Sequence, residues 1–157
     1  MKTFLVVLWV AVAQFFLIAT AAAELSPEQE REIIFDCTQL VQNYAYYRDL
    51  HDPENFANIF TEDARMTARG EWLTGREALM DHVMDGDPDN QSMHMVSTVK
   101  ITPIDEQNAT GVTYSSVVYQ LTGVAVTGKY FDKFVKTEDG WKISERVWSV
   151  IYRNTGG

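Results

Sequence analysis

The sequence predicts an α+β fold in which helices come first and an antiparallel sheet follows them. Apolar residues in the first half of the chain recur at three- and four-residue spacing, a period typical of amphipathic helices. From about residue 93 onward the chain is instead rich in Val, Thr, Tyr and Trp, which favour strands. Because the two patterns are separated along the chain, we expect the helices to cover one face of the sheet.

The first helix is expected to begin at Ser26. The Ser26 side chain can cap the helix, Pro27 suits its first position, and Gln29 can complete a capping box. An apolar face as wide as a core-facing helix requires then follows. The residues of this face are Ile33, Cys37, Leu40, Val41, Tyr44 and Tyr47.

Two shorter helices are expected before the long strands begin. Pro53 bounds the start of one, and the other is expected to run from Thr74 to about Met84. Between them, residues 65–68 and 71–73 are short enough to form a small hairpin.

Four strands joined as a meander are expected in the second half of the chain. They cover residues 93–101, 109–121, 124–135 and 141–152. Between the last two, Asp139-Gly140 is a strong hairpin signal, because both residues tolerate a positive φ. The expected sheet is therefore antiparallel.

The N-terminal segment, residues 1–23, is typical of a signal peptide. Lys2 is followed by an apolar run and then by Ala21-Ala22-Ala23, small residues that a signal peptidase accepts. The alternative, a single membrane anchor, is disfavoured by Gln14 within the run. We therefore expect cleavage after Ala23, a single domain over residues 24–157, a secreted or periplasmic location, and no membrane association after cleavage.

Composition and charge exclude several classes of function. A chain of 157 residues with 46% hydrophobic and 12% aromatic residues is a globular domain rather than a disordered segment. Its formal charge of −9 repels phosphate backbones, so nucleic acid is not an expected partner. One cysteine, Cys37, and three scattered histidines have no zinc-ligand spacing. We expect no metal and no cofactor, and partners that are small molecules or proteins.

Asp49, His51 and His94 are the residues best suited to acid/base chemistry. Imidazole titrates near neutral pH, and a carboxylate beside it fixes its tautomer. On an uninterrupted helix His51 would lie near the centre of the apolar face and Asp49 outside it. Periodicity thus favours a buried His51, whereas a histidine at a helix end also suits solvent or the helix dipole. The residues alone leave both alternatives open.

Polar-tipped aromatic residues suit a ligand pocket. Tyr130 and Asp132 alternate along one expected strand and so share a face, which is either solvated or the wall of a polar cavity. Trp72, Tyr119 and Trp148 are more typical of a core or a cavity wall than of catalysts.

Several short motifs lie between residues 27 and 152. They are Tyr44-Ala45 followed by Arg48-Asp49-Leu50-His51-Asp52, Asn58-Ile59-Phe60-Thr61-Glu62-Asp63-Ala64, Gly75-Arg76-Glu77-Ala78-Leu79, Met93-His94-Met95-Val96-Ser97, Tyr130-Phe131-Asp132 and Glu138-Asp139-Gly140-Trp141-Lys142-Ile143. Together they make the chain resemble the SnoaL-like domains of the nuclear transport factor 2 fold, which include polyketide cyclases and scytalone dehydratase.

The resemblance implies a cone-shaped half-barrel, with three N-terminal helices over a strongly curved antiparallel sheet that wraps a deep pocket. Asp49 matches the family's acidic residue at the first helix end and His94 its strand histidine, which work together in acid/base chemistry. The dehydratases' second catalytic histidine corresponds to Tyr119, and a pocket tyrosine on an early strand to Ala68. The residues expected to line the pocket around this dyad are Tyr44, Trp72, Tyr119, Tyr130, Asp132 and Trp148.

Two classes of function fit these features. The first is an exported, cofactor-independent enzyme for dehydration, isomerisation or cyclisation of a small apolar or phenolic carbonyl substrate. In it His94 would act as base or acid, Asp49 would orient His94, and Tyr119 or Asp132 would hold a carbonyl or hydroxyl group. The second is a noncatalytic module that binds a small ligand or a protein, because this fold hosts both.

The resemblance also implies a homodimer formed through the outer face of the sheet. Val117, Phe131 and Val135 are the residues expected to form an exposed apolar patch there.

Overall fold

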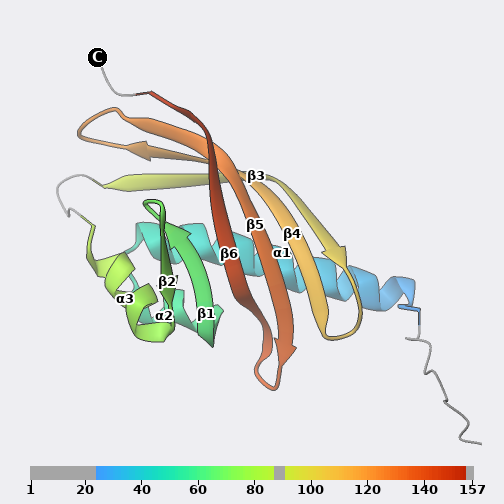
Figure 1. Ribbon diagram of the computed structural model, residues 1–157. Helices are drawn as coiled ribbons and strands as arrows, with labels where there is room; N and C mark the ends of the chain where they lie inside the picture. Colours follow the sequence, from blue (N-terminus) through green and yellow to red (C-terminus); the bar gives the residue numbers. More distant parts are fainter. Residues whose placement is uncertain (1–23, 87–90, 155–157) are drawn as a thin grey trace, which may run out of the picture.

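The computed structural model describes residues 24–86 and 91–154, which form helices packed against a curved sheet (Figure 1). The helices are α1 (Pro27–Asp49), α2 (Pro53–Asn58) and α3 (Arg76–Met84). The strands are β1 (Phe60–Ala68), β2 (Glu71–Thr74), β3 (Ser92–Pro103), β4 (Asn108–Tyr119), β5 (Ala125–Thr137) and β6 (Gly140–Arg153). The predicted α+β class is confirmed.

Helix α1 begins as its sequence predicts. The Ser26 hydroxyl accepts a hydrogen bond from the Gln29 backbone N–H at 3.2 Å, and the Gln29 side chain accepts one from the Ser26 backbone at 2.9 Å. These two bonds complete the capping box. The buried face of the helix includes most of the expected apolar residues and ends, unexpectedly, on a charged one: Ile33, Cys37, Val41, Tyr44, Ala45 and Arg48.

The six strands form one mixed sheet in the order β2-β1-β6-β5-β4-β3. Strands β3 to β6 make the predicted antiparallel meander, and β1 pairs with β2 as the predicted hairpin. One pair differs from the expected antiparallel arrangement, since β1 runs parallel to β6 and places Arg65 opposite Glu145. The whole meander separates these two strands in sequence, so no tight turn requires them to be antiparallel.

The strands bend strongly around α1 (Figure 1). One of several register shifts lies between Thr127 and Gly128 in β5, and such irregularities bend a strand. A Cβ atom at Gly128 would lie 2.3 Å from the Ser149 carbonyl oxygen and 2.8 Å from the Trp148 ring. Only glycine therefore fits at this position, and its absent side chain lets Trp148 lie close against β5.

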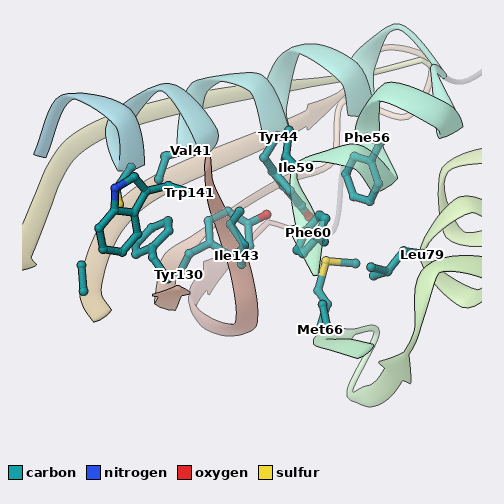
Figure 2. Close-up of a cluster of buried hydrophobic side chains, with 14 of the residues drawn as sticks. Val41, Tyr44, Phe56, Ile59, Phe60, Met66, Leu79, Tyr130, Trp141 and Ile143 are labelled. Atoms are coloured by element: carbon teal, nitrogen blue, oxygen red, sulfur yellow. The ribbon is translucent and has the colours of Figure 1, made fainter. Parts of the chain in front are cut away.

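The core lies between the helices and the inner face of the sheet. Figure 2 shows Val41 and Tyr44 of α1 near Tyr130 of β5, and further along Phe56 close to α1. Cys37 is fully buried in the same core, and burial raises the pKa of its thiol to about 12. The cysteine is therefore a protonated apolar side chain, in line with the interpretation of the sequence.

The outer face of the sheet carries only part of the predicted apolar patch. Phe131 is 46% exposed, and Val135 is half-buried. Val117 is buried, because odd-numbered residues of β4 face the helices whereas Phe131 points the other way across the sheet. The prediction that Val117 belongs to the patch is wrong.

The predicted signal peptide, residues 1–23, lies outside the described residues. Within residues 24–86 and 91–154, no helix is both long and apolar enough to cross a membrane. Helix α1, with 23 residues, carries acidic side chains such as Glu28 and Glu30 in its first turn.

Candidate active site

A cavity of about 580 Å³ opens at the C-terminal end of α1. It lies between that helix end, the β1–β2 hairpin, α3 and the strands β3 to β6. Four of the six predicted lining residues, Tyr44, Tyr119, Tyr130 and Trp148, do line it, together with His94. The other residues around the cavity are Arg48, Thr67, Ala68, Arg69, Gly70, His82, Val117, Val126, Val150 and Arg153.

Asp49 and His94 are in direct contact. Asp49 is the last residue of α1, and His94 lies near the start of β3. The His94 ring Nδ1 is 2.6 Å from Asp49 Oδ1, and the His94 backbone N–H donates to Asp49 Oδ2 at 2.8 Å. Both carboxylate oxygens thus bind the same residue. The side chains are 9% exposed for His94 and 25% for Asp49, so the pair is largely shielded from solvent.

This contact fixes the tautomer of the His94 ring. A carboxylate oxygen accepts hydrogen bonds, so the Nδ1 atom that faces Asp49 carries the proton and donates it. The other ring nitrogen, Nε2, then holds a lone pair and makes no hydrogen bond to any of the described residues. A neutral histidine held in this way is suited to act as a general base, and Asp49 stabilises the imidazolium that would form.

Aromatic rings continue the wall away from His94. The ring centroids of His94 and Tyr44 are 6.3 Å apart, those of Tyr44 and Tyr130 are 5.3 Å apart, and those of Tyr130 and Trp148 are 4.5 Å apart. Burial, followed by the neighbouring Tyr44, raises the pKa of the Tyr130 phenol well above its ordinary value. Tyr130 is therefore a neutral hydrogen-bonding group at physiological pH.

Asp132 does not line the cavity, which corrects the prediction made for it. It lies directly across from Arg146 in the β5–β6 register and accepts bonds from Arg146 Nε at 2.7 Å and Nη2 at 2.8 Å. The alternation of residues along the strand did not show which face of the sheet Asp132 occupies. The structure places Asp132 on the inward face, together with its cationic partner Arg146. Burial opposes the Arg146 charge, but Asp132 outweighs this and raises the pKa of the guanidinium.

The Arg146–Asp132 pair supports the aromatic wall from behind. The Arg146 guanidinium carbon lies 4.1 Å from the Tyr44 ring centroid and 4.5 Å from that of Tyr130. A cation over an aromatic face is attracted to the ring, so Arg146 holds both tyrosines in place. Sequence reasoning did not identify Arg146.

Trp72 also lies away from the cavity, contrary to the prediction. On the β1–β2 hairpin, Met66 and Leu73 face the core, so Trp72 lies on the opposite face. There it is 49% exposed and packs beneath the Arg65 guanidinium, at 4.5 Å from the ring centroid.

His51 is not part of the cavity lining. The periodicity that favoured a buried His51 assumed an uninterrupted helix, but α1 ends at Asp49. His51 follows with a positive φ of 53° and a half-buried side chain. The helix end therefore removes His51 from the apolar face and leaves Asp49 free to reach His94.

Among the cavity residues that the sequence did not indicate are Arg48 and His82. Arg48 lies four residues after Tyr44 and so shares its helix face, a spacing that could have identified it. His82 comes from α3. Burial, followed by the charge of Arg48, lowers the pKa of His82 to about 4, so this imidazole is neutral at physiological pH.

Among the described residues, no group of three or more His, Cys, Asp or Glu side chains is placed to hold a metal ion.

The two positions that the family resemblance aligned with other polar groups, Tyr119 and Ala68, both line the cavity.

Comparison with known proteins agrees with this architecture. A model of the SnoaL-like domain family matches residues 29–147. No curated protein shows significant sequence similarity to the chain.

Three solved structures are similar in fold. A candidate scytalone dehydratase from Novosphingobium aromaticivorans is 22% identical, with a TM-score of 0.75 over 84% of this chain and 93% of that one. The hexachlorocyclohexane dehydrochlorinase LinA-type3 from Novosphingobium barchaimii is 15% identical, with a TM-score of 0.73 over 82% and 93%. A protein of unknown function from Mycobacterium tuberculosis is 24% identical, with a TM-score of 0.70 over 77% of each chain. At these identities the likeness concerns the fold.

Proposed function

Because this chain belongs to the SnoaL-like domain family, we propose that it is a cofactor-independent enzyme in which His94 is the general base and Asp49 its orienting partner. The observation that carries the proposal is the double contact between the Asp49 carboxylate and His94, at 2.6 Å and 2.8 Å. It leaves the basic Nε2 atom without a hydrogen-bond partner among the described residues, beside a cavity large enough for a small molecule.

The proposed reaction begins at a C–H bond next to a carbonyl group. His94 Nε2 takes the proton, and the electron pair of the broken C–H bond moves into the carbonyl group to form an enolate. In a dehydration the enolate expels a hydroxyl group from the β-carbon, and that group takes the proton from the imidazolium and leaves as water. In an isomerisation the imidazolium returns the proton to a different carbon.

The wall of the cavity supports the proposed substrate class. The rings of Tyr44, Tyr130 and Trp148 suit a small apolar or phenolic carbonyl compound. Tyr119 and Tyr130 offer hydroxyl groups that could donate to the carbonyl oxygen and stabilise an enolate. The names of two structural neighbours, a candidate dehydratase and a dehydrochlorinase, both denote eliminations, which favours dehydration within this class.

The second candidate function is binding without turnover. The observation that favours it is Tyr119, which lines the cavity where the dehydratases of the family resemblance have a second histidine. A binding protein would use the same cavity, and the loss of His94 would then change affinity but no reaction rate.

We further propose that the protein is exported, on the strength of the signal-like residues 1–23, and that it forms a homodimer. The outer face of the sheet supports a dimer because Phe131 and Tyr114 are exposed on it. Sedimentation that gives a monomer at micromolar concentration would exclude the dimer.

His94→Ala tests the proposed enzyme. A thermal-shift screen of phenolic and terpenoid carbonyl compounds would first identify ligands, and these would then be assayed for turnover. We expect His94→Ala to lower kcat about 10² to 10⁴-fold, because a positioned base contributes about this much. His51→Asn is the matched control, since His51 lies outside the cavity lining and asparagine tolerates its positive φ. Equal loss in both variants, or no turnover of any ligand by the unmodified protein, would refute catalysis by His94.

A further inference from the structure

The cavity that holds His94 has the opposite charge from the rest of the protein. The whole chain carries a formal charge of −9. Three arginines nevertheless line the cavity, Arg48, Arg69 and Arg153, and no aspartate or glutamate of the described residues lines it. A concave site lined by one sign of charge focuses its field on a ligand of the other sign. The reversal of charge therefore points to an anionic group on the ligand.

Arg48 is the deepest of the three cations. It is 8% exposed, and its Nη1 atom donates to the Val83 carbonyl oxygen at 3.3 Å, near the end of α3. Capping a helix end explains one of the five N–H groups of a guanidinium. No carboxylate among the described residues forms an ion pair with Arg48, whereas buried charges in proteins are normally paired. Arg48 is thus a buried cation with no carboxylate partner among residues 24–86 and 91–154.

His82 provides a second donor in the same place. Both Arg48 and His82 line the cavity, and the charges of Arg48 and Arg69 both act on the His82 imidazole. His82 makes no hydrogen bond to the described residues. A neutral imidazole has one ring N–H, so His82 can donate to an anion that Arg48 attracts.

The other two arginines lie at the rim. Arg69 and Arg153 are both exposed. Arg69 forms an ion pair with Asp85 at 2.9 Å, and both side chains are largely exposed, so solvent and salt weaken that pair. The rim cations can therefore attract an entering anion, but the buried Arg48 is the cation able to hold it.

We propose that the cavity binds a substrate with a carboxylate group, which Arg48 and His82 hold while the apolar body lies along the aromatic wall toward His94. This inference rests on the proposed function and narrows its substrate to carbonyl compounds that also carry a carboxylate. The carboxylate is the favoured anion because its planar pair of oxygens matches the planar guanidinium fork.

The test compares two ligands of the same shape. Binding of 2-naphthoate and of 2-naphthamide is measured by isothermal titration calorimetry at low salt. We expect the carboxylate to bind at least about tenfold more tightly than the amide, since charged hydrogen bonds are the stronger ones. Arg48→Met should abolish this preference and leave the affinity for the amide within about twofold. Equal binding of the two ligands by the unmodified protein would overturn the inference.

Arg31→Met is the matched control. Arg31 lies on the same helix and loses the same charge, but it is exposed in the first turn, where it pairs with Glu28. It should keep the full preference for the carboxylate. A loss as large as that in Arg48→Met would mean that overall charge, and not the cavity, sets the preference, and would contradict the inference.

Two further variants keep the test independent of folding and of catalysis. Arg48→Met could loosen α3, so the double variant Arg69→Met/Arg153→Met, confined to exposed side chains, should retain its Tm and lower the preference about threefold. An unchanged preference in this folded variant would count against the charged cavity. His94→Ala should keep the preference. If it does and no carboxylate-bearing carbonyl compound is turned over by the unmodified protein, the proposed function fails and the binding inference stands.

Discussion

Two carboxylates, Asp132 and Asp49, lie near the aromatic wall, and they differ in the side chains that they bind. Asp132 is fully buried, and both of its carboxylate oxygens accept hydrogen bonds from Arg146. Arg146 is itself buried and packs on the wall from behind. Asp49 is partly exposed and accepts hydrogen bonds from His94 with both oxygens, yet His94 lines the cavity and its Nε2 atom makes no hydrogen bond to the described residues. The Asp132–Arg146 pair lies in the core, where Arg146 Nη1 has no hydrogen-bond partner among the described residues, whereas His94 of the other pair lines the cavity.

The difference shows which charges support the fold and which are available for chemistry. A buried ion pair stabilises little beyond what its burial costs, but removal of one partner leaves a charge in the core. A pair with one free basic atom adds reactivity at that atom. Substitutions at the two carboxylates should therefore separate stability from turnover.

The largest effect on stability is expected at Asp132. Asp132→Asn leaves the Arg146 charge buried without its partner, and we expect a loss of about 3–5 kcal/mol in the free energy of unfolding. Denaturant unfolding measures this loss. Asp139→Asn, in the exposed turn between β5 and β6, is the control and should be close to neutral.

Replacement of both members of the Asp132–Arg146 pair tests whether the loss of stability comes from the unpaired charge. Asp132→Leu/Arg146→Met removes both charges and should recover most of the lost stability, since apolar residues of similar volume often replace a buried pair without loss. If Asp132→Asn unfolds at the same denaturant concentration as the unmodified protein, the pair has no role in supporting the wall.

A smaller effect is expected from pH, at His82. The unfolded chain takes up a proton on His82 near pH 6.5, whereas the folded protein resists protonation down to about pH 4. Between these values the unfolded state binds more protons, so stability should fall as pH falls, by about 1–3 kcal/mol.

His82→Asn isolates this contribution from the carboxylates that titrate in the same range. The charges that act on His82 are Arg48, Arg69, His94 and Asp85, and all of them remain in the variant. The loss of stability between pH 6.5 and pH 4 should be smaller in His82→Asn. Identical pH profiles for the two proteins would show that His82 is not held neutral by the fold.

The smallest effect is expected at Trp72, on the outer face of the β1–β2 hairpin. Trp72→Ala removes an exposed stacking contact with Arg65, worth about 1 kcal/mol or less, and should leave KM unchanged. Trp148→Ala, within the cavity wall, should instead raise KM. A raised KM in Trp72→Ala would contradict this assignment and show that Trp72 contacts the substrate.

The sequence predicted the local elements well, because their signals are local. Ser26 and Gln29 cap α1 through contacts three residues apart, and Asp139-Gly140 marks a turn between adjacent strands. The parallel pairing of β1 with β6 could not be predicted in this way, because it joins segments about 80 residues apart and no turn specifies it.

The site was predicted in part for the same reason. Family resemblance aligned Asp49 and His94, which the structure brings into contact, but alternation along β5 could not say which face Asp132 occupies. Arg48 and His82 meet only because α1 and α3 end at the same place, a tertiary arrangement that no short motif encodes.

General-base action of His94 requires that Asp49 hold the ring proton on His94 Nδ1, and ¹⁵N NMR of the histidine ring reads the position of that proton directly. At a pH where the ring is neutral, we predict a protonated Nδ1 and an unprotonated Nε2 in the unmodified protein. Asp49→Asn offers an amide in place of the carboxylate, so this preference should weaken or reverse, while His51 gives an unchanged signal in both proteins. A neutral His94 with its proton on Nε2 in the unmodified protein would contradict the proposed general base.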